Sequence, residues 1–473
     1  MAFSSMTFLF GFLPAVVIFY FLIPARFRSG RNCILLVFSL LFYAWGGLRL
    51  LPVLLLSCVG NWGAALLLAP ERPHRRAVYG AALAGDLLML GYFKYTGFLL
   101  GNLNALGLEM TVPSIALPAG ISFFTFQAIA YLTDVYRGSI PAERRLGKVL
   151  LFMTFFPQLL QGPILRYADF APAITDRRET GAGAAEGAAR FCFGLAKKVL
   201  LADALGQIAD GAYGAGDRLT MGLAWLGAIA YTLQLYFDFS GYTDMALGLG
   251  RIFGFRLPEN FNYPYIAKSA SEFWRRWHMT LSFWFRDYVY IPLGGNRCAR
   301  SRQLLNLLAV WMLTGLWHGS AWNFVLWGLY YAALLMGEKF LWGRKLEKLP
   351  AALRHVYALF LINLGWVLFR AGSFAQVAEM VSAMFGAAPG GLWSGEAVYY
   401  LRQFRWELLL ALPAALPVKD WLRARLDARR EAGSRTAAVT LELGPKVLAF
   451  ALLGWSVVRL LSSTFRSFLY FQF

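Results

Sequence analysis

The chain contains 473 residues, of which 58% are hydrophobic and only 15% are charged, whereas soluble domains carry roughly 25% charged residues. This composition excludes an ordinary water-soluble protein, and apolar runs of roughly 15 to 25 residues along the chain indicate one polytopic membrane unit. The formal net charge is +19. Most Lys and Arg residues lie in short connections between the apolar runs and not in a separate basic domain, so the charge does not indicate a nucleic-acid-binding protein.

The apolar runs predict an all-α membrane protein with about 11 transmembrane helices, together with interfacial and re-entrant helices. The first run, within residues 1–24, has no basic segment before it, so we expect a retained span and not a cleaved signal peptide. A short second run and a fifth run with Pro and Gly are candidates for tilted or re-entrant helices. The candidate spans lie near 6–24, 32–48, 51–69, 77–100, 113–136, 149–165, 220–249, 303–319, 322–342, 355–372, 399–417 and 446–462.

The basic connections predict the orientation of these spans. The connections 101–112, 320–321 and 373–398 contain no Lys or Arg, while the connections between them are basic. If segment 185–209 lies along the surface, every basic connection falls on the cytoplasmic side and both termini face outward. Lys197 and Lys198 support that assumption, because charged side chains are costly at the bilayer centre.

The long connection 251–302 contains a predicted interfacial helix on the cytoplasmic face. Its aromatic and aliphatic residues recur at helical spacing; they are Phe273, Trp277, Leu281, Trp284 and Tyr288. A second, more polar stripe consists of Arg275, Met279, Ser282 and Arg286. Such a helix is expected in the headgroup layer with its rings toward the lipid. His278 lies at the edge of the apolar stripe, where an anchoring histidine bonded to a neighbour is the alternative to a functional one.

His318 follows Leu307, Trp311 and Gly315 at helical steps in an apolar run. It lies roughly 22 Å of helix beyond Gln303, which predicts a position inside the membrane toward the outer half. Ionisable residues at such depth generally mark function, and a neutral imidazole is suited to general-base catalysis on a hydroxyl. The alternative is a neutral histidine bonded to a backbone carbonyl.

Asp238 and Asp244 lie six residues apart in one apolar run, so they point to different faces of a helix. We expect a structural role in which they hold Arg side chains from 251–302. The sequence predicts no metal site and no disulfide framework, because the cysteines show no CxxC spacing; they are Cys33, Cys58, Cys192 and Cys298.

Several stretches of the sequence resemble the membrane-bound O-acyltransferase superfamily: LPAGISFFTFQAIAYLTDVYRG, FFPQLLQGPILRY, YFDFSGYTDMALGLGRIFGFRLPENFNYPYIAKSASEFWRRWHMTLSFWFRDYVYIPLGGNR and WMLTGLWHGSAWNFVLWG. The run from Tyr236 to Arg297 is similar to the alginate O-acetyltransferase branch. The resemblance, which covers roughly residues 1–370, implies helices arranged around a central tunnel and funnel. We expect residues 1–473 to form one integral-membrane domain. It also implies that His318 is essential where the two passages meet, and that His278 is a second important position.

The resemblance further implies a cytosolic acyl thioester as donor, with acetyl-CoA favoured as a substrate and no permanently bound cofactor. The anionic phosphates of the donor are expected to be attracted to basic side chains; the candidates are Arg275, Arg276, Arg286 and Arg297. The acceptor is expected to be an extracytoplasmic polysaccharide, reached with an esterase-like acetyltransferase partner. The implied location is a bacterial cytoplasmic (inner) membrane.

The C-terminal tail, 463–473, is expected on the extracytoplasmic side. Its final residues, FLYFQF, resemble a motif in which a tyrosine carries the acyl group, which makes Tyr470 a third candidate catalytic residue. An aromatic tail lying in the membrane interface is the simpler alternative.

Three other functions remain open at this stage. The first is D-alanyl transfer from a carrier protein, as in teichoic-acid modification. The second is a transporter or flippase with His318 as a proton relay, for which the sequence shows no matching halves. The third is a structural membrane scaffold, which would tolerate the loss of His318.

Overall fold

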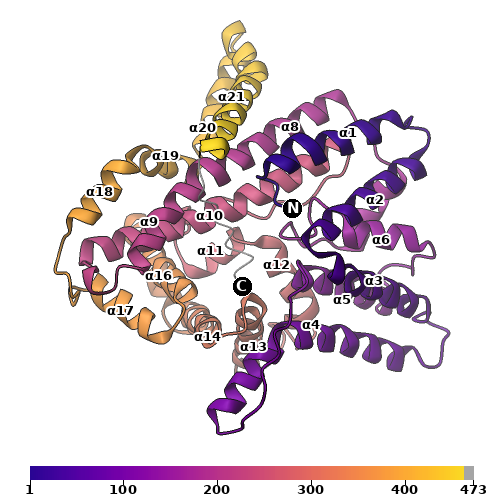
Figure 1. The fold of residues 1–473 in the computed structure, drawn as a ribbon, viewed down its shortest axis with the longest axis horizontal. Helices are drawn as coiled ribbons and strands as arrows, with labels where there is room; N and C mark the ends of the chain where they lie inside the picture. The colour runs from indigo at the N-terminus through magenta and orange to yellow at the C-terminus, as the bar shows by residue number, and fades with distance from the viewer. Residues whose placement is uncertain (463–473) are drawn as a thin grey trace. The chain divides into compact units, whose positions relative to one another are not determined.

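The computed structural model describes residues 1–462, which fold into helices joined by turns and loops (Figure 1). Tyr470 lies outside the described residues. The chain forms two compact units that alternate along the sequence. Unit 1 comprises residues 1–187, 246–258 and 283–289, and unit 2 comprises residues 188–245, 259–282 and the chain from Tyr290 onward. The prediction of a single domain remains a prediction.

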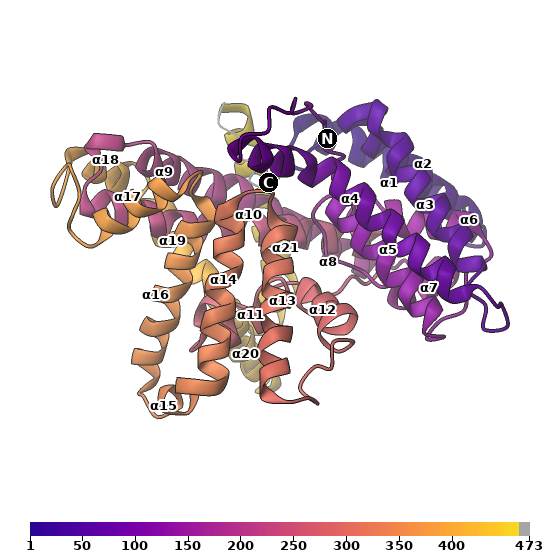
Figure 2. The same ribbon diagram turned by 90° about the horizontal axis from the view of Figure 1, so that it is seen from below.

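Unit 1 is built from long apolar helices, of which α3, α4 and α5 pack side by side (Figures 1 and 2). Arg177 connects segments of unit 1 that are far apart in the sequence. Its guanidinium donates to the Tyr20 hydroxyl at 2.9 Å, to Asn32 Oδ1 at 2.7 Å and to the Phe253 carbonyl at 3.0 Å. The elements wholly within unit 1 are η1 (Phe8–Phe12), α1 (Leu13–Leu22), α2 (Arg28–Gly47), η2 (Leu48–Leu50), α3 (Leu51–Leu66), α4 (Arg75–Ala105), α5 (Ile121–Tyr136), α6 (Leu146–Thr154) and α7 (Tyr167–Thr175).

Unit 2 contains the two candidate histidines. Helices α13, α14 and α16 lie side by side in both views (Figures 1 and 2). The elements wholly within unit 2 are η3 (Lys197–Ala202), α9 (Asp203–Tyr213), η4 (Gly216–Arg218), η5 (Pro264–Ile266), α11 (Ala270–Arg276), α13 (Arg300–His318), α14 (Trp322–Gly337), η7 (Glu338–Trp342), α15 (Gly343–Glu347), α16 (Ala351–Arg370), α17 (Phe374–Met384), α18 (Gly395–Gln403), α19 (Arg405–Ala415), α20 (Val418–Glu431) and α21 (Arg435–Ser462). The elements that pass between the units are α8 (Gly181–Ala196), α10 (Met221–Ile252), α12 (Met279–Phe285) and η6 (Arg286–Tyr290).

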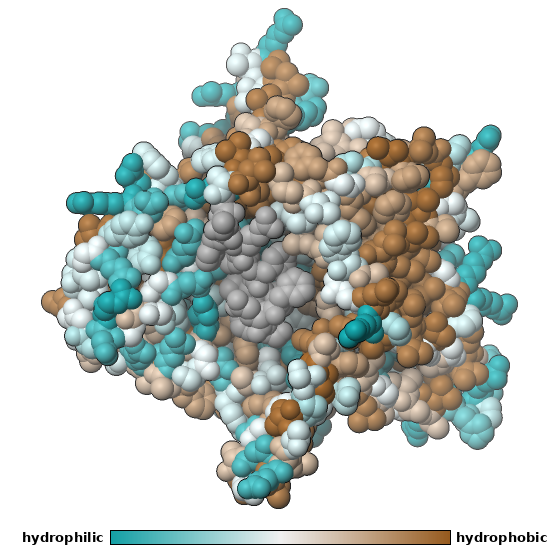
Figure 3. Space-filling view, viewed as in Figure 1, coloured by the Kyte–Doolittle hydropathy of each residue, from teal (hydrophilic) through white to brown (hydrophobic). Residues whose placement is uncertain are grey.

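Within residues 1–462, four helical stretches are long and apolar enough to cross a membrane: Arg28–Leu66, Trp322–Glu347, Ala351–Arg370 and Arg435–Ser462. Each coincides with one or more predicted spans. The large hydrophobic side chains that α1, α2 and α3 leave exposed suit a lipid environment, and Figure 3 shows hydrophobic surface gathered over the N-terminal helices. The total of about 11 spans and the tunnel remain predictions.

Helices α8 and α10 cross closely within unit 2. A Cβ on Gly194 would lie 2.5 Å from the Gly241 carbonyl oxygen, and one on Gly241 would lie 2.8 Å from the Gly194 oxygen. The absence of side chains at both positions therefore lets the two backbones touch. Beyond this crossing, the segment predicted to lie along the surface continues as helix through η3 and α9.

The carboxylates of α10 are held by cations from this neighbouring helix. Lys198 contacts Asp238 at 2.7 Å and Lys197 contacts Asp244 at 2.7 Å. Arg190 also donates to Asp244, at 2.9 Å. The predicted structural role of both aspartates is confirmed, but the predicted partners are wrong. The cations come from residues 190–198 and not from 251–302, because the glycine crossing brings α8 and η3 against α10.

Candidate active site

His318 is the last residue of α13, and a tight helix hairpin fixes its position. Gly319 to Ala321 connect α13 to α14, and the two helices pack through glycines. A Cβ on Gly315 would lie 2.4 Å from the Phe324 carbonyl oxygen, and one on Gly328 would lie 2.5 Å from the Trp311 oxygen. Only glycine fits both contacts, so the hairpin has little freedom in how it presents His318.

The His318 imidazole is enclosed by aromatic rings. The centroids of Trp317, Trp327 and Phe369 lie 4.9, 5.0 and 5.2 Å from its own. The residue is 8% exposed, which keeps bulk water away from the ring. Its place at a helix C-terminus suits proton acceptance, because the negative end of the helix dipole stabilises a cation that forms there.

His278 lies where the predicted interfacial helix is interrupted. Residues 270–290 form α11, a break at Trp277 and His278, then α12 and η6. The prediction of one continuous helix is therefore wrong. His278 has a φ of 45°, a left-handed conformation that costs a non-glycine residue on the order of 1 kcal/mol and cannot continue a right-handed helix.

Three rings of the apolar stripe, those of Phe273, Trp277 and Trp284, are buried in protein. Phe273 and Trp277 are 0% and 2% exposed, whereas the sequence predicted that they face lipid. Trp274 packs against Trp311 of α13, with centroids 4.8 Å apart. The apolar stripe thus indicated burial correctly but did not distinguish a protein core from a bilayer.

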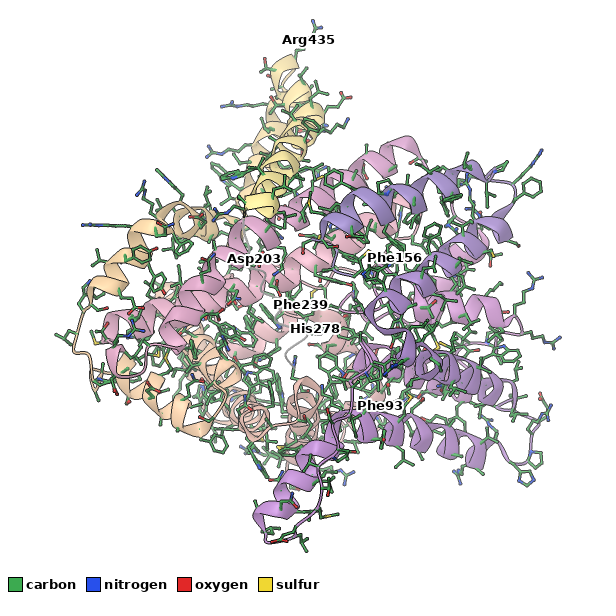
Figure 4. All side chains as sticks on the ribbon, in the orientation of Figure 1. Phe93, Phe156, Asp203, Phe239, His278 and Arg435 are labelled. Carbon is green, nitrogen blue, oxygen red and sulfur yellow. The ribbon has the colours of Figure 1, made fainter. Side chains whose placement is uncertain are left out.

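His278 itself is 1% exposed and packs edge-on against Phe239 of α10, with centroids 4.8 Å apart (Figure 4). Burial lowers the pKa of its imidazole from 6.5 to about 3, because the charged form loses its hydration. The ring is therefore neutral near pH 7.

A residue that the sequence did not single out, Asn260, contacts His278. The Asn260 Oδ1 atom lies 3.2 Å from His278 Nδ1, and it accepts hydrogen bonds from the backbone N–H and the hydroxyl of Thr280 at 3.2 and 2.9 Å. Asn260 is 0% exposed. It stands in the stretch LPENFNYPY, which looks like an ordinary polar loop, and no spacing rule links it to position 278.

The two histidines contact the same indole. The centroid of Trp317 lies 5.8 Å from that of His278 and 4.9 Å from that of His318. The sequence predicted different membrane depths for the two histidines, since it counted His318 along a helix and His278 in a surface segment. In the structure His278 is buried in the core of unit 2, where its ring contacts the neighbour of His318.

The four candidate donor-binding arginines differ in their contacts. In unit 2, Arg275 and Arg297 are exposed and make no ion pair with residues 1–462, whereas Arg276 donates to Glu272 at 3.0 Å. Arg286 belongs to unit 1 and pairs with the adjacent Asp287 at 2.7 Å. Two of the four are thus engaged by carboxylates. Within the described chain, no group of three or more His, Cys, Asp or Glu residues is placed to hold a metal ion.

Comparisons with known proteins show which family the chain belongs to. The model of the membrane-bound O-acyltransferase family matches residues 145–388, which include both histidines. A protein of Azotobacter vinelandii named probable alginate O-acetylase AlgI is 40% identical over 506 aligned residues that cover 100% of both chains. A peptidoglycan O-acetyltransferase of Helicobacter pylori is 34% identical over 81% of this chain and 80% of its own. A teichoic acid D-alanyltransferase of Bacillus subtilis is 33% identical over 49% of this chain and 62% of its own.

The family prediction made from the sequence motifs is confirmed by the length of these matches. The full-length relatives are named for O-acetyl transfer, and the apolar helices of the described chain agree with a polytopic membrane protein. The chain belongs to the membrane-bound O-acyltransferase family and is a multi-pass membrane O-acyltransferase.

Proposed function

We propose that the protein moves an acetyl group from cytosolic acetyl-CoA to an extracytoplasmic polysaccharide. The observation that carries this proposal is the pair of buried imidazoles that both contact Trp317. The names of the relatives support acetyl as the acyl group and a polysaccharide of the cell envelope as the acceptor.

His318 acts as the general base in this scheme. It removes the proton from an attacking hydroxyl while the hydroxyl oxygen bonds to the acetyl carbonyl carbon. The C–S bond of the thioester then breaks, and the proton passes from the imidazolium to the CoA thiolate. No net proton or electron is consumed, and the product is an ester plus CoA thiol. The aromatic surroundings of His318 exclude the water that would otherwise hydrolyse the thioester.

The donor is held on the cytoplasmic side by basic side chains. Arg275 and Arg297 are exposed, which suits contact with the CoA phosphates. Arg276 and Arg286 are expected to contribute electrostatic attraction, since each is already paired with a carboxylate. Only the acetyl end of the donor has to approach the histidines.

The attacking hydroxyl is proposed to be the phenol of Tyr470. A phenol with an ordinary pKa of about 10 is a weak nucleophile at neutral pH, so it needs a base such as His318. The acetyl-tyrosine ester would then pass its acetyl group to an esterase-like partner outside the membrane. That partner would complete the transfer to the polysaccharide.

The test uses purified full-length protein and acetyl-CoA with an isotope-labelled acetyl group. We expect mass spectrometry to find the label on the C-terminal peptide of the wild type. His318→Gln should abolish labelling, because the amide cannot accept the proton, while His74→Gln serves as the matched control on a connecting loop. Tyr470→Phe should remove the labelled site.

Different results contradict different parts of the scheme. If Tyr470→Phe acetylates an added acceptor at the wild-type rate, the relay is wrong and direct transfer stands. If His318→Gln consumes acetyl-CoA at the wild-type rate, the role of His318 is wrong. If the protein accepts a labelled D-alanyl group from a carrier protein and does not consume acetyl-CoA, the proposed donor is wrong.

A further inference from the structure

Two stretches of unit 2 meet at the break between α11 and α12. The Met279 N–H donates to the Asn260 carbonyl at 3.0 Å, and the Asn262 N–H donates to the Arg276 carbonyl at 2.9 Å. These backbone bonds hold residues 260–262 against the chain on both sides of His278. The Asn260 side chain is therefore fixed beside the imidazole.

The orientation of the Asn260 amide follows from its contact with Thr280. A backbone N–H is only a donor, so the Asn260 atom that faces the Thr280 N–H at 3.2 Å has to be the carbonyl oxygen and not the NH₂ group. The Thr280 hydroxyl lies 2.9 Å from the same atom and donates to it. The amide is thus oriented by a partner other than the histidine.

The same oxygen determines the tautomer of His278. Nδ1 lies 3.2 Å from Asn260 Oδ1, and two acceptors at that distance would repel each other, so Nδ1 has to carry the proton. In a neutral imidazole the other nitrogen, Nε2, then has the free lone pair. We propose that Asn260 is a positioning residue that holds His278 in the Nδ1–H tautomer with Nε2 as its acceptor atom.

The buried lone pair indicates what this tautomer is for. His278 Nε2 is buried and has no hydrogen-bond partner among residues 1–462. An unsatisfied buried acceptor is costly in a resting protein. The ring also contacts Trp317, which contacts His318. His278 Nε2 is therefore placed to accept a hydrogen bond from the acyl donor or the acceptor hydroxyl, an inference that rests on the proposed function.

The tautomer is measured directly by NMR on full-length protein labelled with ¹⁵N-histidine. The chain has four histidines, and His278→Asn identifies the signals of position 278. We expect the wild type to show a proton on Nδ1 and none on Nε2. Asn260→Ala should give a mixture of tautomers, and Asn260→Asp should restore the Nδ1–H form because it retains an acceptor oxygen. Asn363→Ala, which removes another buried amide of unit 2, should leave the tautomer unchanged.

Acetyl-CoA turnover is the second readout. Asn260→Ala should lower kcat about 10- to 100-fold with little change in KM, and Asn260→Asp should recover most of the rate. A proton on Nε2 in the wild type would overturn the inference without any variant. An unchanged tautomer in folded Asn260→Ala would overturn it as well. If the tautomers behave as expected but the wild type transfers no acyl group from any thioester, the proposed function fails and the tautomer assignment stands.

Discussion

His278 shows how one residue can interrupt a helix and serve a site. Trp277 is extended and ends α11, and the positive φ of His278 prevents the helix from resuming at once. The His278 carbonyl then accepts hydrogen bonds from the N–H groups of Leu281 and Ser282 at 3.1 and 3.2 Å, which begins α12. The backbone strain is tolerated because Asn260 and the packed rings of Phe239 and Trp317 hold the side chain. The conformation thus depends on contacts between segments distant in sequence.

The neutral buried imidazole predicts a specific pH dependence of stability. The unfolded chain takes up a proton at His278 between the ordinary pKa of 6.5 and the folded value of about 3, whereas the folded chain does not. The free energy of unfolding therefore falls as the pH decreases through this window. His278→Asn removes that contribution, and asparagine tolerates a positive φ. In detergent, Tm should fall more steeply for the wild type than for His278→Asn from about pH 6.5 to about pH 5. Parallel curves would contradict the buried neutral state.

At the scale of elements, the α13–α14 hairpin depends on backbone contact. The Cβ of an alanine at 315 would meet the Phe324 carbonyl oxygen at 2.4 Å, and that oxygen belongs to a helix backbone. Gly315→Ala is therefore expected to force the two helices apart and to displace His318. Other glycines in long helices have open space around them. A Gly→Ala substitution should therefore lower stability at some positions and raise it at others.

Gly315→Ala should destabilise the protein by about 1–3 kcal/mol and lower acyl transfer, because the helices cannot keep their spacing. The matched control is Gly454→Ala in α21, where a Cβ has nothing within 4 Å. There the loss of glycine flexibility should raise stability by about 0.5–1 kcal/mol. Thermal unfolding in detergent and acetyl-CoA turnover measure both effects. Equal Tm changes in the two variants would contradict the close backbone contact between α13 and α14.

The predictions from sequence were most accurate where local pattern and tertiary structure agree. The predicted spans that correspond to α2, α14, α16 and α21 lie in helical stretches that are long and apolar enough to cross a membrane. The helical spacing of the apolar residues across 273–288 continues through His278, so periodicity alone could not reveal the break in the helix. The break is maintained by contacts of His278 with Asn260 and Phe239. The partners of Asp244 were missed for the same reason, because a glycine crossing between α8 and α10 selects them.

At the scale of the whole molecule, both candidate histidines and Trp317 belong to unit 2. The family motifs identified His318 and His278 without knowledge of their contacts, whereas their common neighbour emerged only from the fold. The distribution of Lys and Arg predicted which connections lie on the cytoplasmic side of a membrane. The described helices provide apolar lengths suited to that environment. The sequence thus singled out the two histidines but not the indole that both of them contact.

The interleaving of the two units has a consequence for biosynthesis. Unit 1 includes residues 246–258 and 283–289, so a ribosome has to translate past residue 289 before all parts of that unit exist. Arg177 acquires its bond to the Phe253 carbonyl only after residue 253 has been made. A truncated product 1–187 should therefore be cleaved by trypsin after Arg177, whereas a product 1–299 should resist cleavage there. Nascent protein made by this route would need protection by insertion factors until well over half of its length has emerged.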